Sequence, residues 1–377
     1  MKETMGIIYT SKDEFSMREL SSNRSVTAIP VAARYRLVDF QLSNLVNSGI
    51  RKVGVLMQGR YNSLMDHLGS GKEWNLHTRN NGMYILPPSH TGASDGYLGV
   101  LDGIMANLDF LRRSNHDYVL IVGGRMVYNT LYNDMIRLHE DSGADVTMMY
   151  TRFDPVAFDF SNTSRDTRAF VGVNDEGQIT DIEINPNVIS YHNILMDVVL
   201  MKRTLLMHMV DLAVSRGYHE LYESIIRPGI VDKSMKVMGC EFKGYCRRME
   251  TVNSYYNLNM DLLDPAVRKE LFGKNPVFTK TRDDAPTKYL PGAMVKNSLI
   301  ADGCEIEGEV ENSVLFRGVK VCKGARIKGA IIMQDGYIGE DSLLENVILD
   351  KDVTVLKGGK MVAPKQYPVV LGKNVTI

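Results

Sequence analysis

The sequence predicts an α/β domain followed by a left-handed parallel β-helix. From Met1 to about Asp264, short apolar runs alternate with amphipathic stretches, which is typical of α/β domains. From about Ala285 the helical periodicity disappears, and four segments with an apolar triplet and a turn align at offsets of 15, 17 and 16 residues. Repeats of this length are typical of a β-helix with three hexapeptide-like sides. The four segments begin at Asn297, Asn312, Gly329 and Glu345.

Individual elements of the first domain follow from its apolar runs. We expect buried strands at 53–58, 117–124 and 144–153, and helices at 98–115 and 130–143. The segment 170–186 predicts a hairpin whose turn lies at 175–177. A closing helix is expected at 253–272, with a break near Pro265.

A proline-rich stretch divides the chain. We predict a first domain at 1–264, a linker at 265–291 and a β-helix domain at 292–377.

The net charge of −1 argues against nucleic acid or an anionic membrane as a partner. The apolar runs are too short to span a bilayer, and the first residues do not resemble a signal peptide. We therefore expect a cytoplasmic protein.

The cysteines and histidines predict no zinc site. The four cysteines show no C-x-x-C spacing, and the eight histidines form no cluster with them. We expect four free, buried or half-buried thiols, as in a reducing compartment.

Several long motifs carry a resemblance to a known family. They are YRLVDFQLSNLVNSGIRKVGVLMQ, SLMDHLGSGKEW, GYLGVLDGI, NSYYNLNMDLL and NSVLFRGVKV, and they are spread over most of the chain. On these motifs the sequence resembles the ADP-glucose pyrophosphorylases, which join ATP and glucose 1-phosphate and release pyrophosphate. The resemblance implies a Rossmann-like nucleotidyltransferase domain with a mixed, mostly parallel sheet ahead of the β-helix.

The positions that carry the family's chemistry are altered. No glycine occurs between Gly6 and Gly49, where the family has a glycine-rich phosphate loop, and Ser11 to Phe15 stand there instead. In RSVT, Val26 replaces a lysine, and in IEINP, Asn185 replaces the lysine that holds the sugar phosphate. In IVGGRMVY and CRRMETV, Gly124 and Arg248 replace the two metal-binding aspartates. The resemblance thus implies that no catalytic residue set and no Mg²⁺ site remain.

This pattern resembles the regulatory, non-catalytic subunits of the family in glycogen biosynthesis. It implies a degenerate site for ATP, metal and sugar phosphate, and a hetero-oligomer, expected to be a tetramer, in which the chain activates a catalytic partner subunit. The alternative is a catalytically active glucose-1-phosphate adenylyltransferase with an unusual site. A hexapeptide-repeat acyltransferase is excluded, because such enzymes need a histidine on the β-helix and none follows His219.

Two further groups of residues have a functional and a structural interpretation. Gln58, Gly99 and Asp102 match positions near the nucleotide in active relatives, which indicates a vestigial substrate pocket. Alternatively, Gly99 serves helix packing and Asp102 caps a helix. Arg34 and Arg36 stand where the family carries a basic residue near a sugar-phosphate effector. Alternatively, these arginines pair with Asp39 or are solvated.

Overall fold

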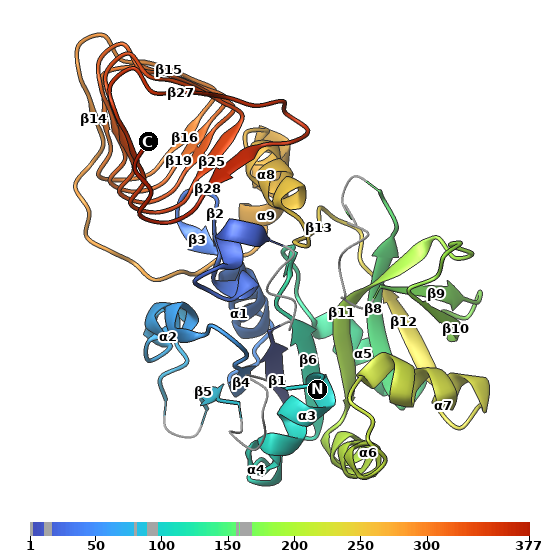
Figure 1. Cartoon of the computed structure of the whole chain (residues 1–377). Coiled ribbons are helices and arrows are strands. Elements are labelled where there is room, and N and C mark those ends of the chain that lie inside the picture. Colours follow the sequence, from blue (N-terminus) through green and yellow to red (C-terminus); the bar gives the residue numbers. More distant parts are fainter. Residues whose placement is uncertain (1–2, 11–16, 79–80, 89–96, 156–157, 159–167) are drawn as a thin grey trace.

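The computed structural model describes residues 3–10, 17–78, 81–88, 97–155, 158 and 168–377. Figure 1 shows an α/β lobe and a β-helix of triangular cross-section, with helices α8 (Val252–Asp261) and α9 (Pro265–Phe272) lying between them. The segment Ser11 to Phe15, predicted to replace the phosphate loop, lies outside the described residues. The predicted fold class is confirmed.

A mixed sheet forms the centre of the α/β lobe. Its parallel half joins β1 (Thr4–Tyr9) to β4 (Val53–Leu56) and β6 (Tyr118–Gly123), with β5 (Met83–Leu86) outside β4. The long strand β11 (Asn193–Lys202) runs antiparallel between β6 and β8 (Val146–Arg152), and β12 (Val237–Glu241) runs parallel to β8. Strands β1, β4 and β6 are rich in Val, Ile and Leu and largely buried, as parallel strands covered on both faces require.

The predicted strands and the predicted hairpin are confirmed. The hairpin consists of β9 (Ala169–Val173) and β10 (Ile179–Ile184), which pair antiparallel. Among the described residues, the other α-helices of the lobe are α1 (Leu37–Asn47), α2 (Asn62–Leu68), α3 (Val100–Ala106), α4 (Leu108–Arg112), α5 (Asn133–Ser142), α6 (Arg203–Ser215) and α7 (Arg227–Val231).

The prediction of one continuous helix at 98–115 is wrong, because the chain breaks at Asn107 between α3 and α4. The Asn107 side chain donates to the Gly103 carbonyl and to the Tyr97 hydroxyl, at 3.0 and 2.8 Å. Such side-chain bonds compete with the helical backbone pattern. The break at Pro265 is confirmed, and Asp264 caps α9 by accepting from the Ala266 N–H at 2.8 Å.

Three parallel sheets build the β-helix. The first contains β14 (Lys288–Tyr289), β17 (Glu305–Ile306), β20 (Lys320–Val321), β23 (Tyr337–Ile338) and β26 (Thr354–Val355). The second contains β15 (Met294–Lys296), β18 (Glu309–Glu311), β21 (Arg326–Lys328), β24 (Leu343–Glu345) and β27 (Lys360–Val362). The third contains β16 (Leu299–Ile300), β19 (Val314–Leu315), β22 (Ile331–Ile332), β25 (Val347–Leu349) and β28 (Val369–Leu371).

The register of the coils corrects one predicted offset. Leu299 pairs with Val314 and Val314 with Ile331, which confirms the offsets of 15 and 17 residues. Ile331 then pairs with Ile348, so the last predicted offset of 16 is wrong by one residue. Both α9 and β14 lie within the stretch 265–291 that the sequence predicts as a linker.

The two lobes share a buried junction. An apolar cluster contains Phe40 and Tyr255 from the α/β lobe together with Phe316 and Ile348 from the β-helix. The Tyr256 hydroxyl donates to the Gly329 carbonyl at 2.8 Å. The four cysteines are free, as predicted. Within the described ranges, no helix is both long and apolar enough to cross a membrane.

Candidate functional site

The end of β6 is crowded where the family would place a metal-binding carboxylate. Gly124 follows β6 directly, and its N–H donates to the Tyr9 carbonyl at 3.0 Å. A Cβ atom at Gly124 would lie 2.1 Å from the Thr27 Cγ2 atom. Thr27 is itself buried and its hydroxyl lies 3.0 Å from that of Ser25. The position therefore has no room for an aspartate unless the Thr27 segment moves.

Arg248 lies beside this strand end in a buried ion network. Strand β13 (Arg247–Arg248) pairs with β7 (Met126–Val127), which begins two residues after Gly124. The Arg248 guanidinium contacts Asp197 at 2.8 Å and Glu250 at 2.5 Å. The Arg248 and Glu250 side chains are 4% and 1% exposed, and that of Asp197 is 10% exposed. A fixed guanidinium thus supplies the positive charge of this site.

Asp197 adopts a left-handed backbone conformation, which is uncommon for residues other than glycine and which aspartate tolerates better than most. It lies inside β11 with φ of 57°, at the point where the pairing with β8 shifts register. The left-handed region costs most non-glycine residues roughly 1–2 kcal/mol, and it costs aspartate less because its short polar side chain can hydrogen-bond locally. The Tyr222 hydroxyl lies 3.5 Å from the Asp197 carboxylate, and burial, followed by the charge of Asp197, raises the pKa of Tyr222 well above its usual range. Strain of this kind persists where the surroundings hold it, and the ion pair with Arg248 holds it here.

These residues do not fit a magnesium ion. Mg²⁺ prefers several oxygen ligands in octahedral geometry. Gly124 offers no side-chain oxygen, and Arg248 brings a positive charge into contact with the nearby carboxylates. In the part of the chain that the structure describes, no group of three or more His, Cys, Asp or Glu residues could hold a metal ion.

The other two altered positions, Val26 and Asn185, have contacts of the kind that stabilise the fold. Val26 is 4% exposed and belongs to the apolar cluster at the junction of the lobes. Asn185 ends the β9–β10 hairpin with φ of 48°, and its side chain accepts from the Arg168 N–H at 2.8 Å. Asparagine tolerates this left-handed conformation. The structure brings Arg248 close to the strand after Gly124, whereas Asn185 lies in an exposed turn.

The predicted vestigial pocket residues gather around Tyr97 and His219. Gln58 donates to the Tyr97 carbonyl at 2.9 Å. A Cβ atom at Gly99 would lie 2.3 Å from the His219 carbonyl oxygen, so a glycine is required for this close approach. Asp102 Oδ1 lies 2.8 Å from His219 Nδ1, and the start of α3 has no side-chain cap. The alternative in which Asp102 caps the helix is therefore wrong, because Asp102 pairs with His219 instead.

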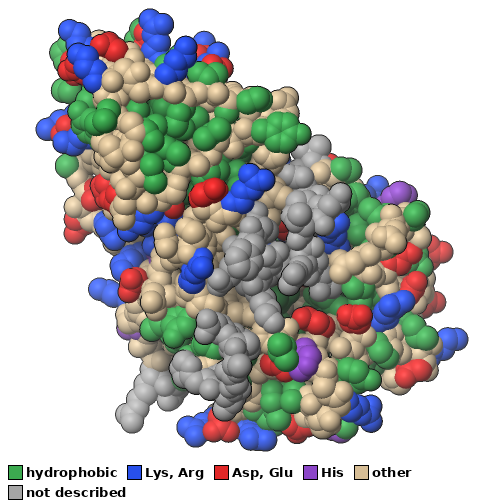
Figure 2. Space-filling model, in the orientation of Figure 1, with side chains coloured by type: hydrophobic (Ala, Val, Ile, Leu, Met, Phe, Trp, Pro, Cys, Tyr) green, Lys and Arg blue, Asp and Glu red, His purple; other side chains and the backbone are tan. Residues whose placement is uncertain are grey.

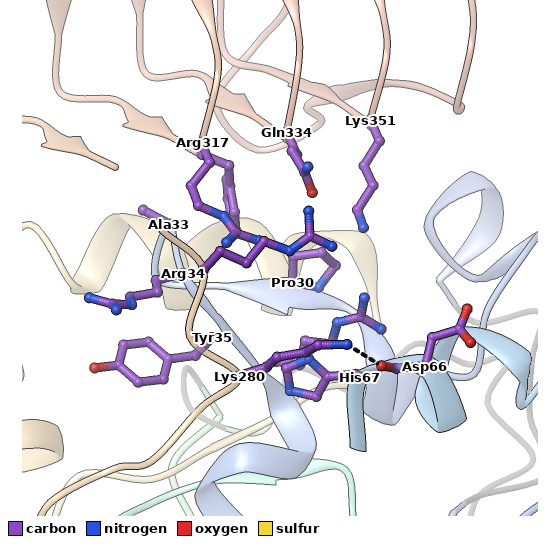
Figure 3. Close-up of a pocket in the computed structure, with 13 residues that line it drawn as sticks. Pro30, Ala33, Arg34, Tyr35, Asp66, His67, Lys280, Arg317, Gln334 and Lys351 are labelled. Carbon is purple, nitrogen blue, oxygen red and sulfur yellow. Dashed lines mark hydrogen bonds between the residues drawn. The ribbon is translucent and has the colours of Figure 1, made fainter. Parts of the chain in front are cut away.

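Arg34 and Arg36 line a pocket between the two lobes. Figure 3 shows residues of the α/β lobe and the linker on one side of this pocket and three β-helix residues on the other. Arg317, Gln334 and Lys351 come from successive coils and stand in a row above the hairpin of β2 (Pro30–Val31) and β3 (Tyr35–Arg36). The Lys280 ammonium donates to the Asp66 carbonyl at 2.6 Å. The pocket lining is Pro30, Ala33, Arg34, Tyr35, Arg36, Asp66, His67, Lys280, Arg282, Phe316, Arg317, Gln334 and Lys351.

This pocket is strongly cationic. Its lining holds six arginine or lysine side chains and one carboxylate, Asp66. Burial lowers the pKa of Arg36 to about 10, against the opposing effect of Asp39. Burial, aided by the charges of Arg36 and Arg24, lowers the pKa of Lys351 to about 8. Crowded positive charges without equal compensation favour a bound anion.

The alternative interpretation of the two arginines is partly correct. The Arg36 backbone N–H donates to the Asp39 carboxylate at 2.9 Å, whereas its guanidinium donates to the Ser63 carbonyl and hydroxyl at 2.6 and 2.9 Å. Arg34 is exposed at the pocket mouth. Asp39 instead bonds His67, at 2.6 Å.

Sequence reasoning missed most of the residues that complete these two sites. Asp197 and His219 stand in no motif that predicts a contact with Arg248 or Asp102, whereas Glu250 lies in CRRMETV, two residues after Arg248. Arg317, Gln334 and Lys351 could have been predicted from the sequence, because they occupy equivalent positions in three aligned coils. A correct last offset, followed by a comparison of turn residues between coils, would have placed them in one row.

Comparisons with known proteins agree with this fold. A family model described as nucleotidyl transferase matches residues 16–157, and one described as GlmU-like, C-terminal hexapeptide matches residues 286–363. The chain is 34% identical to the glycogen biosynthesis protein GlgD of Bacillus subtilis, over 99% of this chain and 96% of that protein.

Enzymes named glucose-1-phosphate adenylyltransferase are also similar. The one from Mycoplasma mobile is 32% identical over 87% of this chain and 85% of its own length. The one from Clostridium perfringens strain 13 is 30% identical over 100% of this chain and 95% of its own length. On these similarities over nearly the whole chain, together with the fold, the protein belongs to the ADP-glucose pyrophosphorylase family.

Proposed function

We propose that this chain is a regulatory subunit of glucose-1-phosphate adenylyltransferase in glycogen biosynthesis. It has little or no activity of its own and activates a catalytic partner subunit by forming a hetero-oligomer with it. The observation that carries the proposal is the ion network of Arg248, Asp197 and Glu250. A guanidinium neutralised by two carboxylates cannot bind and orient a triphosphate and its leaving group as a metal ion does.

Two further observations support this proposal. The side chain of Thr27 fills the space that an aspartate at position 124 would need. The similarity to GlgD of Bacillus subtilis extends over nearly the whole of both chains. The GlgD-like chain would supply the fold and its contacts, and the partner subunit would supply the chemistry.

A direct assay tests the proposal. With ATP, glucose 1-phosphate and Mg²⁺, the isolated chain is expected to release pyrophosphate about a thousandfold more slowly than a catalytic relative, because loss of the metal removes several kcal/mol of transition-state stabilisation. Added to a catalytic relative from the same genome, the chain is expected to form a stable complex and raise the rate. Neither a complex nor a change in rate would contradict the proposal.

The alternative is an active adenylyltransferase, and the similarity to the enzymes of Mycoplasma mobile and Clostridium perfringens favours it. It predicts activity of the isolated chain near that of those relatives, lost on Asp102→Asn. The same assay therefore distinguishes the two functions.

We further propose that the cationic pocket binds a phosphorylated sugar as an effector. Besides its charge, the pocket has strained backbone beside it: Ala32 and Ala33 both have left-handed φ angles, of 54° and 61°. The Asn259 side chain holds this turn by accepting from the Ala32 N–H at 3.0 Å. The strained turn places Arg34 and Arg36 on the wall of the pocket, and strain of this kind is found at functional sites.

The affinity of the pocket for a phosphate ester should fall as the pH rises from 7 to 9. Lys351, with a pKa of about 8, loses its proton over this range, while a phosphate stays dianionic because its second pKa is about 6. Lys351→Met is expected to weaken the binding of glucose 6-phosphate about tenfold at pH 7 and to flatten the pH dependence. Isothermal titration calorimetry at several pH values measures both effects.

A matched control is Lys328→Met, which removes an exposed lysine of the same β-helix away from the pocket. This variant should keep both the affinity and the pH profile. An unchanged pH profile in Lys351→Met would contradict the assignment of Lys351.

A further inference from the structure

Lys351 brings an unpartnered amine into the cationic pocket between the lobes. Figure 3 shows its side chain extending from the β-helix into the pocket. Within the described part of the chain, its ammonium forms no hydrogen bond or ion pair. The carboxylate of the adjacent Asp350 is taken up by Arg24, which donates to both of its oxygens at 2.7 Å. The Lys351 amine is therefore held in the pocket without a carboxylate in contact with it.

The other lysine of the pocket differs in this respect. Lys280 donates from its ammonium to the Asp66 carbonyl at 2.6 Å, so its amine already has an acceptor. Of the two lysines that line the pocket, only Lys351 has an amine without a partner among the described residues.

The surroundings of Lys351 favour its neutral form. Burial, aided by the positive charges of Arg36 and Arg24, lowers the pKa of Lys351 to about 8. At pH 7.5 roughly a quarter of such amines are neutral, against about one in a thousand for an ordinary lysine. The neutral amine is the nucleophile in lysine chemistry. Lys351 thus combines a reactive form with an open position.

Arginines around this amine provide a place for a phosphate group. Burial, and then the charge of Arg282, lowers the pKa of Arg317, and Arg282 also adds to the lowering that burial causes at Arg36. The Arg282 guanidinium forms no hydrogen bond or ion pair with any residue that the structure describes. Elsewhere on the face seen in Figure 2, Lys and Arg side chains lie among Asp and Glu. The pocket instead has one carboxylate for six cations, which favours a bound phosphate.

We infer that Lys351 is a modification site, acylated directly by an acyl phosphate whose phosphate group is held by the pocket arginines. The amine attacks the carbonyl carbon, a C–N bond forms, and the bond from that carbon to the phosphate oxygen breaks. The phosphate leaves with the bonding electrons and takes up the amine proton, so the products are an acylated lysine and hydrogen phosphate. The inference rests on the part of the proposed function in which this pocket binds a phosphate group.

Acylation changes what the pocket can bind. An acylated lysine carries no positive charge, so the anion loses one of its charged partners. The affinity for glucose 6-phosphate should fall about tenfold, as it should for Lys351→Met. The modification therefore lowers effector affinity when activated acyl groups are abundant.

Reaction of the full-length chain with acetyl phosphate tests the inference. Peptide mass spectrometry measures the rate of acetylation at Lys351 and at Lys328, an exposed lysine of the same β-helix outside the pocket. At pH 7.5 Lys351 should react at least about tenfold faster, and its rate should level off above about pH 8, where its amine is mostly neutral. Inorganic phosphate should protect Lys351 and leave the rate at Lys328 unchanged.

A neutral acyl donor separates recognition of the phosphate from simple reactivity of the amine. Arg282→Gln should slow the acetylation of Lys351 by acetyl phosphate about fivefold, and should leave its reaction with N-hydroxysuccinimidyl acetate within about twofold. Arg326→Gln is the matched control, because Arg326 is an exposed arginine of β21 outside the pocket, and it should change neither rate. Circular dichroism shows whether each variant keeps the fold.

The outcomes separate the inference from the proposed function. If Lys351 reacts no faster than Lys328 with acetyl phosphate, the inference is wrong, whatever the titration with glucose 6-phosphate shows. If Lys351 is equally preferred by both donors, with no protection by phosphate and no effect of Arg282→Gln, recognition of the phosphate is overturned. If Lys351 is acetylated selectively and protected by inorganic phosphate while glucose 6-phosphate does not bind, the inference stands and the effector role fails.

Discussion

Replacing Arg248 with alanine is expected to lower the free energy of unfolding by about 3–5 kcal/mol. The substitution removes the guanidinium that contacts Asp197 and Glu250, and it leaves two carboxylates close together in a buried site. The strained backbone of Asp197 loses its compensating ion pair at the same time. Urea unfolding followed by circular dichroism measures the change from the shift in midpoint at constant slope.

A surface arginine provides the control for this experiment. Arg326 lies on β21, is 69% exposed and contacts Glu309 at 3.7 Å. Arg326→Ala should change stability by less than about 0.5 kcal/mol, because exposed ion pairs contribute little. A triple variant with Arg248→Met, Asp197→Asn and Glu250→Gln should recover much of the loss, since it removes the charges together. A loss below about 1 kcal/mol for Arg248→Ala would show that the network does not stabilise the fold.

The fold could be predicted from the sequence because the patterns that indicate it are local. Buried strands such as 53–56 and 118–123 are short apolar runs, and the β-helix repeats its pattern at nearly constant spacing. One error arose where a side chain overrode the local pattern, and the other where the length of a coil was misjudged by one residue. Asn107 breaks a helix whose apolar spacing continues through it, and one coil is a residue longer than its aligned letters indicate.

The ion network around Arg248 was harder to predict, because the residues that contact one another there come from strands far apart in the sequence. The motifs identified Gly124 and Arg248 as altered, yet no local pattern connects Arg248 to Asp197, which lies on β11. The left-handed backbone of Asp197 is equally invisible in the sequence, since an aspartate inside an apolar strand does not by itself indicate a positive φ. Sequence therefore indicated which residues were replaced, and the structure adds how the resulting charges are balanced.

Breaking the ion pair between Arg24 and Asp350 is expected to be as destabilising as the loss of Arg248. The Arg24 guanidinium donates to both Asp350 carboxylate oxygens at 2.7 Å, and the side chains are 4% and 1% exposed. The pair joins the α/β lobe to the β-helix, so Arg24→Ala leaves the buried Asp350 carboxylate without its guanidinium, with the Lys351 N–H still donating to it at 2.7 Å. We expect a loss of about 3–5 kcal/mol in urea unfolding, with faster amide exchange in the neighbouring coils.

Lys320→Ala is the matched control, because Lys320 is 55% exposed and contacts Glu305 at 3.4 Å on the surface of the β-helix. Its loss should change stability by less than about 0.5 kcal/mol. Arg24 also lowers the pKa of the neighbouring Lys351, so Arg24→Ala should move the midpoint of pH-dependent phosphate binding upward. A stability change as small as that of Lys320→Ala, with the midpoint unmoved, would contradict this account. The two readouts together separate a contact that only stabilises the junction from one that also sets the charge of the pocket beside it.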